Sequence, residues 1–151
     1  MTIELRTLPI GRKHRGQPGM AKKILIVEDS PTQAGKTKFI LENKGYEVTI
    51  ALSGEDGLEQ AAKIRPDLIV LDVHLPNLSG FEVCKTLKSN LALRSIPIIM
   101  FSSENKLRNM VSAYEMGADY YVVKSEEGER VLTLLIETVF TRMSRRVFQA
   151  S

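Results

Sequence analysis

The sequence has a single cysteine, Cys84, and no long apolar run. One cysteine cannot form an intrachain disulfide, which fits a reducing compartment. The apolar runs fall far short of the ~20 residues that a membrane-spanning helix needs. The N-terminus is basic, but the apolar segment of a secretory signal is missing. We therefore expect a cytoplasmic protein without a membrane span.

Cys84 is interpreted as a small apolar helix residue rather than as a nucleophile. No helper histidine stands near it in the sequence, and its neighbours follow an amphipathic pattern. The chain of 151 residues is long enough for one domain with a hydrophobic core. Its hydrophobic content of 43% and charged content of 26% are ordinary for a globular protein.

The formal net charge of +3 is concentrated at the two ends of the chain. Residues 1–23 hold six basic and one acidic residue, and residues 142–151 hold three arginines and no acid. The segment between them is mildly acidic. We expect a flexible basic extension at 1–21, a domain at 22–143 and a short basic tail at 144–151. Such arms are more often solvated than bound to nucleic acid, so no specific nucleic-acid partner is predicted.

Apolar runs alternate with helical patterns from Lys23 onward. The runs read as continuous apolar stretches, which is typical of parallel strands buried on both faces. We expect a doubly wound α/β domain with a five-stranded parallel sheet. The predicted strands are 23–27, 47–51, 67–72, 96–102 and 119–123, and the predicted helices are 31–44, 53–64, 80–89, 104–116 and 128–143.

Several helix boundaries have local signals. Ser30 followed by Pro31 predicts a helix start, since proline is favoured in the first turn. Gly45 predicts a helix end, and Ser53 predicts an N-terminal cap. A serine after the fourth strand, either Ser102 or Ser103, is expected to cap the following helix.

Polar side chains follow four of the predicted strands, and ligands of such sheets bind beyond the carboxyl ends of the strands. Three carboxylates in one place repel each other unless a cation neutralises them. Mg²⁺ prefers oxygen ligands and completes its shell with water and phosphate oxygens. The pattern therefore predicts a site for a phosphoryl group beside Mg²⁺, built from Glu28, Asp29, Asp72, Ser102, Ser103 and Lys124.

The segment 30–37, SPTQAGKT, offers an alternative, because its end resembles a nucleotide-binding P-loop. The first glycine of that motif is replaced by Ser30, and Pro31 has no N–H to give a phosphate. The two preceding acids would also repel a triphosphate. We therefore interpret Lys36 as an exposed helix lysine. Gly35 in mid-helix costs roughly 1 kcal/mol relative to alanine, and close packing is the hypothesis for its presence.

Four stretches together resemble the receiver domain of two-component response regulators: KILIVEDSP, DLIVLDVHLPNLSG, IPIIMFSSE and GADYYVVK. The resemblance covers about residues 22–143. It implies the flavodoxin-like (βα)5 fold, in agreement with the alternation of strands and helices.

The resemblance also implies a role for each site residue. Asp72 corresponds to the aspartate that accepts a phosphoryl group from a histidine kinase or phosphotransfer protein. Asp29, Asp72 and the backbone carbonyl of His74 correspond to the Mg²⁺ ligands, with Glu28 acting through a water. Lys124 corresponds to the lysine that holds a phosphoryl oxygen.

Ser102 and Tyr121 correspond to the family's switch pair, in which the aromatic side chain turns inward when the hydroxyl moves toward the phosphoryl group. The resemblance implies that this change alters the surface formed by residues 104–143. The side chains of His74 and Glu104 are expected to tune how water reaches the aspartyl phosphate.

One residue departs from the family pattern. Ser125 stands where the family usually has a proline after the lysine. A cis bond before a residue other than proline costs about 3–4 kcal/mol. We therefore expect a trans bond and a reshaped loop, which affects the geometry of Lys124.

The leading hypothesis is a stand-alone receiver. Such a protein is not a classical enzyme, although it assists its own phosphorylation and dephosphorylation. Its output would pass through a downstream protein, and a homodimer through the 104–143 surface is plausible. The alternatives are a receiver-like scaffold that works without phosphorylation and a nucleotide-binding enzyme.

Overall fold

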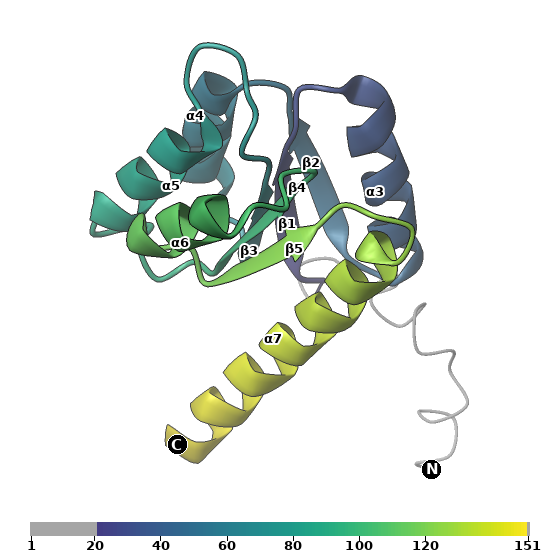
Figure 1. Cartoon of the computed structure of the whole chain (residues 1–151). Helices are drawn as coiled ribbons and strands as arrows, with labels where there is room; N and C mark the ends of the chain where they lie inside the picture. Colours follow the sequence, from purple (N-terminus) through teal and green to yellow (C-terminus); the bar gives the residue numbers. More distant parts are fainter. Residues whose placement is uncertain (1–20, 151) are drawn as a thin grey trace.

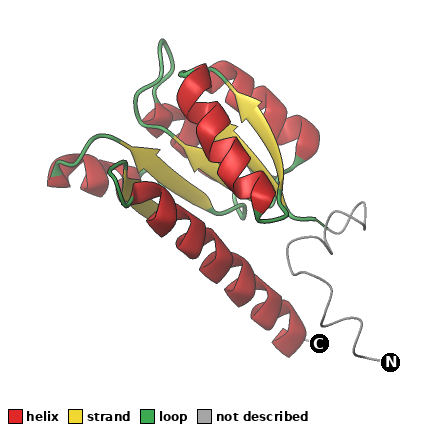
Figure 2. Ribbon diagram, turned by 90° about the vertical axis from the view of Figure 1, so that its right-hand side faces the viewer, coloured by secondary structure: helices red, strands yellow, loops and turns green. Residues whose placement is uncertain are grey.

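The computed structural model describes residues 21–150. The predicted extension at 1–21 lies almost wholly outside this range. A single parallel sheet forms the centre of the molecule, with helices on both of its faces (Figures 1 and 2). The strand order is β2-β1-β3-β4-β5. The strands are β1 (Lys23–Val27), β2 (Glu47–Ala51), β3 (Leu68–Leu71), β4 (Ile98–Ser102) and β5 (Tyr120–Val123).

A helix follows each strand, so the prediction of a doubly wound α/β fold is confirmed. The helices α4, α5 and α6 lie on one face of the sheet, and α3 and α7 lie on the other (Figure 1). The helices are α3 (Pro31–Asn43), α4 (Gly54–Ile64), α5 (Gly80–Ser89), α6 (Leu107–Glu115) and α7 (Gly128–Ala150).

Each face of the sheet has its own hydrophobic core. Side chains alternate between the faces of a strand, so neighbouring residues of β1 enter different cores. Leu25 packs with residues of α4 and α5, such as Ala61 and Leu87. Ile24 packs on the opposite face with α3 and α7 residues. Because both faces are covered, the central strands are apolar except at Lys23, which begins β1, and Ser102, which ends β4.

The local signals place the helix boundaries well. The Ser30 hydroxyl accepts a hydrogen bond from the Gln33 N–H at 3.3 Å, and Pro31 occupies the first turn of α3. Gly45 has a φ of 96°, a conformation that glycine adopts without strain. Ser53 caps α4 through the Asp56 N–H at 3.0 Å.

Two predicted boundaries are wrong. The last helix does not end at Met143 but continues to Ala150, so the segment 144–150 of the predicted tail is helical. These residues include no glycine or proline to stop the helix. Figure 1 shows α7 extending well beyond the edge of the sheet. Helix α6 begins at Leu107 rather than at 104, and its N-cap is Lys106 rather than a serine.

The hypothesis that Gly35 serves close packing is also wrong. A Cβ atom built at Gly35 would have no atom within 4 Å outside its own helix and chain neighbours. The residue lies on the exposed side of α3. None of the helices in the described part of the chain is long and apolar enough to cross a membrane.

Candidate functional site

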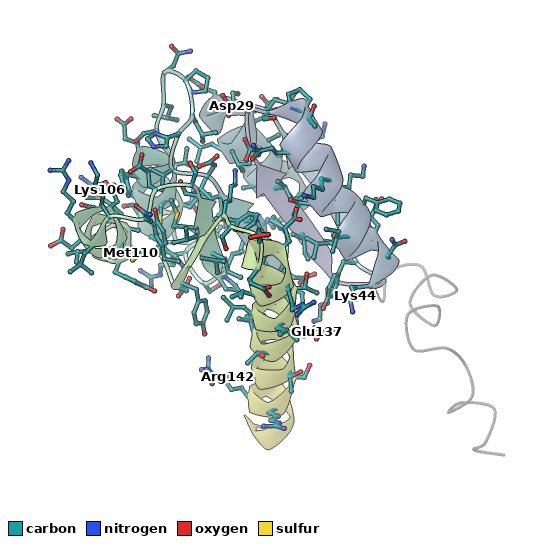
Figure 3. All side chains as sticks on the ribbon, turned by 45° about the vertical axis from the view of Figure 1, so that its right-hand side comes forward. Asp29, Lys44, Lys106, Met110, Glu137 and Arg142 are labelled. Carbon is teal, nitrogen blue, oxygen red and sulfur yellow. The ribbon has the colours of Figure 1, made fainter. Side chains whose placement is uncertain are left out.

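A cavity of about 470 Å³ opens at the carboxyl edge of the sheet. It lies beyond β1 and β3, where the connections lead to helices on opposite faces, the place where ligands of such sheets bind. Figure 3 labels Asp29 at this edge. The lining residues come from four strand ends and from α3 and α7: Glu28, Asp29, Ser30, Gln33, Lys36, Thr37, Asp72, His74, Phe101, Ser103, Lys124, Ser125 and Glu129.

The three predicted acids lie together in this cavity. Carboxylate oxygens of Glu28, Asp29 and Asp72 all lie within 4.8 Å of one another. Glu28 and Asp72 are buried, and Asp29 is exposed. A group of oxygen donors that is open to water on one side suits Mg²⁺, which keeps several water ligands. The donor set therefore fits the metal that the sequence predicted.

Lys124 places its ammonium group among these acids. Its Nζ donates to Glu28 Oε1, to Asp72 Oδ2 at 3.0 Å and to Gln33 Oε1 at 2.9 Å. Burial by itself would lower the pKa of Lys124, but the hydrogen bond to Glu28 and the charge of Asp72 outweigh it and raise that pKa. The lysine therefore stays charged at neutral pH.

Burial raises the pKa of Glu28, and the hydrogen bonds from Lys124 and from the Ser30 N–H offset only part of that effect. The Ser30 N–H donates to Glu28 Oε2 at 3.1 Å. Glu28 is thus held by a cation on one oxygen and by the start of α3 on the other. A second cation in the cavity would further favour its charged form.

The backbone around Asp72 is tightly fixed. Its N–H donates to the Val27 carbonyl at 3.0 Å, and its Oδ1 accepts from the His74 N–H at 3.1 Å. A Cβ atom at Gly80 would lie 2.0 Å from the Asp72 carbonyl oxygen, so only glycine fits there. The turn before α5 therefore packs directly against the residue that the sequence predicted as the phosphoryl acceptor.

The predicted switch residues meet at the end of β4. Ser102 is fully buried, and its Oγ accepts from the Glu104 N–H at 3.3 Å. The Tyr121 hydroxyl donates to the Glu104 carbonyl at 2.8 Å. Both side chains therefore hold the same short loop, although Ser103 rather than Ser102 lines the cavity.

His74 and Glu104 are joined across the mouth of the site. His74 Nε2 lies 2.5 Å from Glu104 Oε2, and the Asn109 amide donates to Glu104 Oε1 at 2.9 Å. The bridge connects the loop after β3 with the loop after β4. The sequence indicated both side chains separately, but their contact depends on the folded positions of two loops.

Several lining residues were not predicted as site residues, among them Gln33, Lys36 and Thr37 of α3 and Glu129 of α7. Gln33 contacts Lys124, while Thr37 and Lys36 contact Glu129. Lys36 Nζ lies 3.3 Å from Glu129 Oε1, and Thr37 Oγ1 lies 3.4 Å from Glu129 Oε2. The helical spacing of 33, 36 and 37 could have indicated one face of α3, but nothing in the sequence indicates what that face contacts.

The P-loop alternative is excluded by the same helix. Residues 31–43 are helical, so the segment cannot wrap its backbone N–H groups around a phosphate. The loop after β5 agrees with the expectation for Ser125, because the Lys124–Ser125 bond is trans. The Gly128 N–H donates to the Ser125 carbonyl at 3.0 Å, which closes the turn into α7.

Residues 24–136 match the model of the response regulator receiver domain, which is more than half of the chain. The chain belongs to the response regulator receiver domain family. In this receiver domain Glu28, Asp29 and Asp72 lie together with Lys124 at the carboxyl edge of the sheet.

Relatives and solved structures agree with the assignment. The transcriptional regulatory protein AfsQ1 of Streptomyces coelicolor is 41% identical over 81% of this chain and 52% of its own length. Protein PilG of Pseudomonas aeruginosa is 32% identical over 73% of this chain and 82% of its own length.

The signal receiver domain of a histidine kinase from Syntrophus aciditrophicus superposes with a TM-score of 0.76 at 37% identity. That match covers 83% of this chain and 94% of the solved chain. The chain spans about half the length of AfsQ1 and of the other transcriptional regulators that it matches.

Proposed function

We propose that this receiver domain accepts a phosphoryl group on Asp72 from a histidine kinase or phosphotransfer protein. The observation that carries the proposal is the position of the buried Asp72 carboxylate, between the Lys124 ammonium and the two acids at the end of β1. A carboxylate placed beside a fixed cation can act as a nucleophile toward phosphorus.

In the proposed step an Asp72 carboxylate oxygen attacks the phosphorus of a phosphohistidine. The new P–O bond forms as the P–N bond breaks, and its electron pair returns to the imidazole nitrogen of the donor. The phosphohistidine reacts with a proton on its other ring nitrogen, so the products are an aspartyl phosphate and a neutral histidine. Lys124, already 3.0 Å from Asp72 Oδ2, would move its hydrogen bond to a phosphoryl oxygen and so assist the reaction.

Mg²⁺ held by Asp29, Asp72 and the His74 carbonyl, with Glu28 acting through a water, would supply positive charge that offsets the phosphoryl oxygens. The clustering of the three carboxylates supports this ligand set. Water that releases the phosphoryl group would pass the His74–Glu104 bridge, since the His74 N–H donates to Asp72 Oδ1 and the His74 side chain contacts Glu104.

The output would pass through the loop that Ser102 and Tyr121 share. If the Ser102 hydroxyl left the Glu104 N–H and moved toward a phosphoryl oxygen, this loop would be released. The 104–143 surface would then change. That surface exposes Leu107, Val111 and Tyr114 at helical spacing on α6. A downstream protein, or a second copy of the chain, would bind there.

A cytoplasmic location remains part of the proposal. A scaffold that works without phosphorylation is the competing function, and labelling of Asp72 decides between the two.

Intact-mass spectrometry after incubation with acetyl phosphate and Mg²⁺ tests the proposal. The wild type should gain one phosphoryl group and Asp72→Asn should gain none. Asp67→Asn is the matched control, because Asp67 lies before β3 at the opposite edge of the sheet, where its side chain accepts the Lys23 N–H. Labelling of Asp72→Asn, or no labelling of the folded wild type, would overturn the assignment.

A further inference from the structure

Gln33 contacts the reacting centre from a helix that carries none of the predicted site residues. We propose that Gln33 is a positioning residue for phosphoryl transfer, because its side-chain carbonyl holds the Lys124 ammonium against Asp72. The inference rests on the proposed function. It adds α3 to the elements that build the site, through the 2.9 Å contact between Gln33 Oε1 and Lys124 Nζ.

The other two acceptors of Lys124 have a second task. Glu28 and Asp72 both belong to the carboxylate cluster that fits a metal, so each would bind the metal as well as accept a hydrogen bond from the lysine. Gln33 lies outside that cluster. An ammonium has three N–H donors, and Gln33 fixes one of them whatever the two carboxylates bind.

Contacts along the same helix fix the position of Gln33. Its N–H donates to the Ser30 Oγ at the start of α3. One turn further on, Lys36 and Thr37 both bind Glu129 in the first turn of α7. The loop from Lys124 to α7 is therefore held between two sets of contacts with α3.

The Gln33 side chain is neutral, and this matters for phosphoryl transfer as much as its acceptor oxygen does. Four carboxylates already line the cavity, three of them in the cluster that fits a metal, and an incoming phosphoryl donor is itself an anion. A further carboxylate at position 33 would hold the ammonium equally well but would repel the donor. Glutamine provides the acceptor oxygen without that repulsion.

The test is a set of full-length variants: Gln33→Met, Gln33→Glu and the control Thr32→Ala. Thr32 is exposed in the same turn of α3 but does not line the cavity. The initial labelling rate is measured by intact mass against acetyl phosphate concentration at fixed Mg²⁺, with melting temperatures beside it. Thr32→Ala should label as the wild type does.

Gln33→Met should lower the saturating rate by about tenfold, since it removes a hydrogen bond to a charged group. Its melting temperature should stay close to that of the wild type, because the Gln33 side chain is exposed. Gln33→Glu should keep most of the saturating rate but raise the acetyl phosphate concentration at half-saturation. A lower saturating rate in Gln33→Met and a higher half-saturating concentration in Gln33→Glu would distinguish a positioning role from a general loss of structure.

A double-mutant cycle with Lys124→Met shows whether Gln33 acts through the lysine. In that background Gln33→Met should have no further effect. Where Lys124→Met gains too little label, the same cycle is measured from the rise in melting temperature that beryllofluoride and Mg²⁺ produce. The inference would be overturned if Gln33→Met labelled at the wild-type rate, or if Gln33→Met had its full effect in the Lys124→Met background. The proposed function would still stand in either case, provided that the wild type gains its label. If the wild type itself gains no label, the proposed function fails and the inference fails with it.

Discussion

Replacing Gly35 by alanine should stabilise this domain, although Gly35 lies in the middle of a helix next to the site. Glycine in an exposed helix interior is less favourable than alanine by about 0.5–1 kcal/mol, because it loses more backbone freedom on folding. A Cβ at this position meets no atom within 4 Å outside its own helix and chain neighbours. The full gain in helix propensity should therefore appear in the free energy of unfolding.

Gly57 in α4 provides the matched comparison. The same substitution there brings the same gain in propensity, but the new Cβ would lie 2.9 Å from both methyl groups of Val27. Overpacking of this kind costs about 1–3 kcal/mol. Gly57→Ala should therefore be less stable than the wild type. Because the gain in propensity is common to both variants, they should differ by the overpacking cost of roughly 1–3 kcal/mol.

Urea unfolding followed by circular dichroism measures both variants, since the chain has no tryptophan for fluorescence. Gly35→Ala should raise the melting temperature by roughly 2–4 °C. Equal shifts in the two variants would refute the reasoning, because they would show that packing around the new methyl group does not matter. A loss of stability in Gly35→Ala would show that helix propensity does not control this position.

The other predictions concern the metal site, the buried thiol and a half-buried lysine. Mg²⁺ at a hundredfold excess over its dissociation constant should stabilise the fold by about 2.7 kcal/mol. Asp29→Asn should lose most of this gain in a thermal-shift titration, and an unchanged Mg²⁺ response would contradict the ligand set. Burial raises the pKa of the Cys84 thiol to about 11. The folded protein should thus react slowly with a disulfide reagent at pH 8 and quickly in denaturant. The ordinary pKa of an unfolded thiol is 9.0, so the contribution of Cys84 to stability should decline from pH 9 up to about 11. Rapid native labelling at pH 8 would mean that the thiol is accessible. Lys88→Met should destabilise the domain by about 2–3 kcal/mol, because Lys88 Nζ donates to the carbonyls of Arg94 and Ile96 and to Asp119 Oδ2. A loss below about 0.5 kcal/mol in urea unfolding would show that water replaces these bonds.

Most of the fold could be predicted because its signals are local. The strands are continuous apolar runs, and Gly45, Ser53 and the Ser30–Pro31 pair indicate helix boundaries through their own backbone and side-chain chemistry. The extent of α7 could not be predicted so well. The sequence predicts a helix over 128–143 followed by a basic tail, whereas α7 continues to Ala150 through residues that include no glycine or proline.

The acidic site was predictable for a different reason. In a parallel sheet every strand ends at the same edge, so residues that follow the strands in sequence must gather there. The positions of Glu28, Asp29, Asp72 and Lys124 follow from this rule together with the order of the chain. Their residue types then indicate a metal and a phosphoryl group.

The sequence by itself determined the parallel α/β fold and the carboxylate cluster with its lysine, since both follow from patterns repeated within short segments. Only the tertiary structure decided which groups from distant segments touch. The contacts of Gln33 with Lys124 and of His74 with Glu104 join loops and helices that are far apart in the chain. Their geometry depends on how helices pack on the sheet, and that packing is set by the shapes of many side chains together rather than by any local pattern.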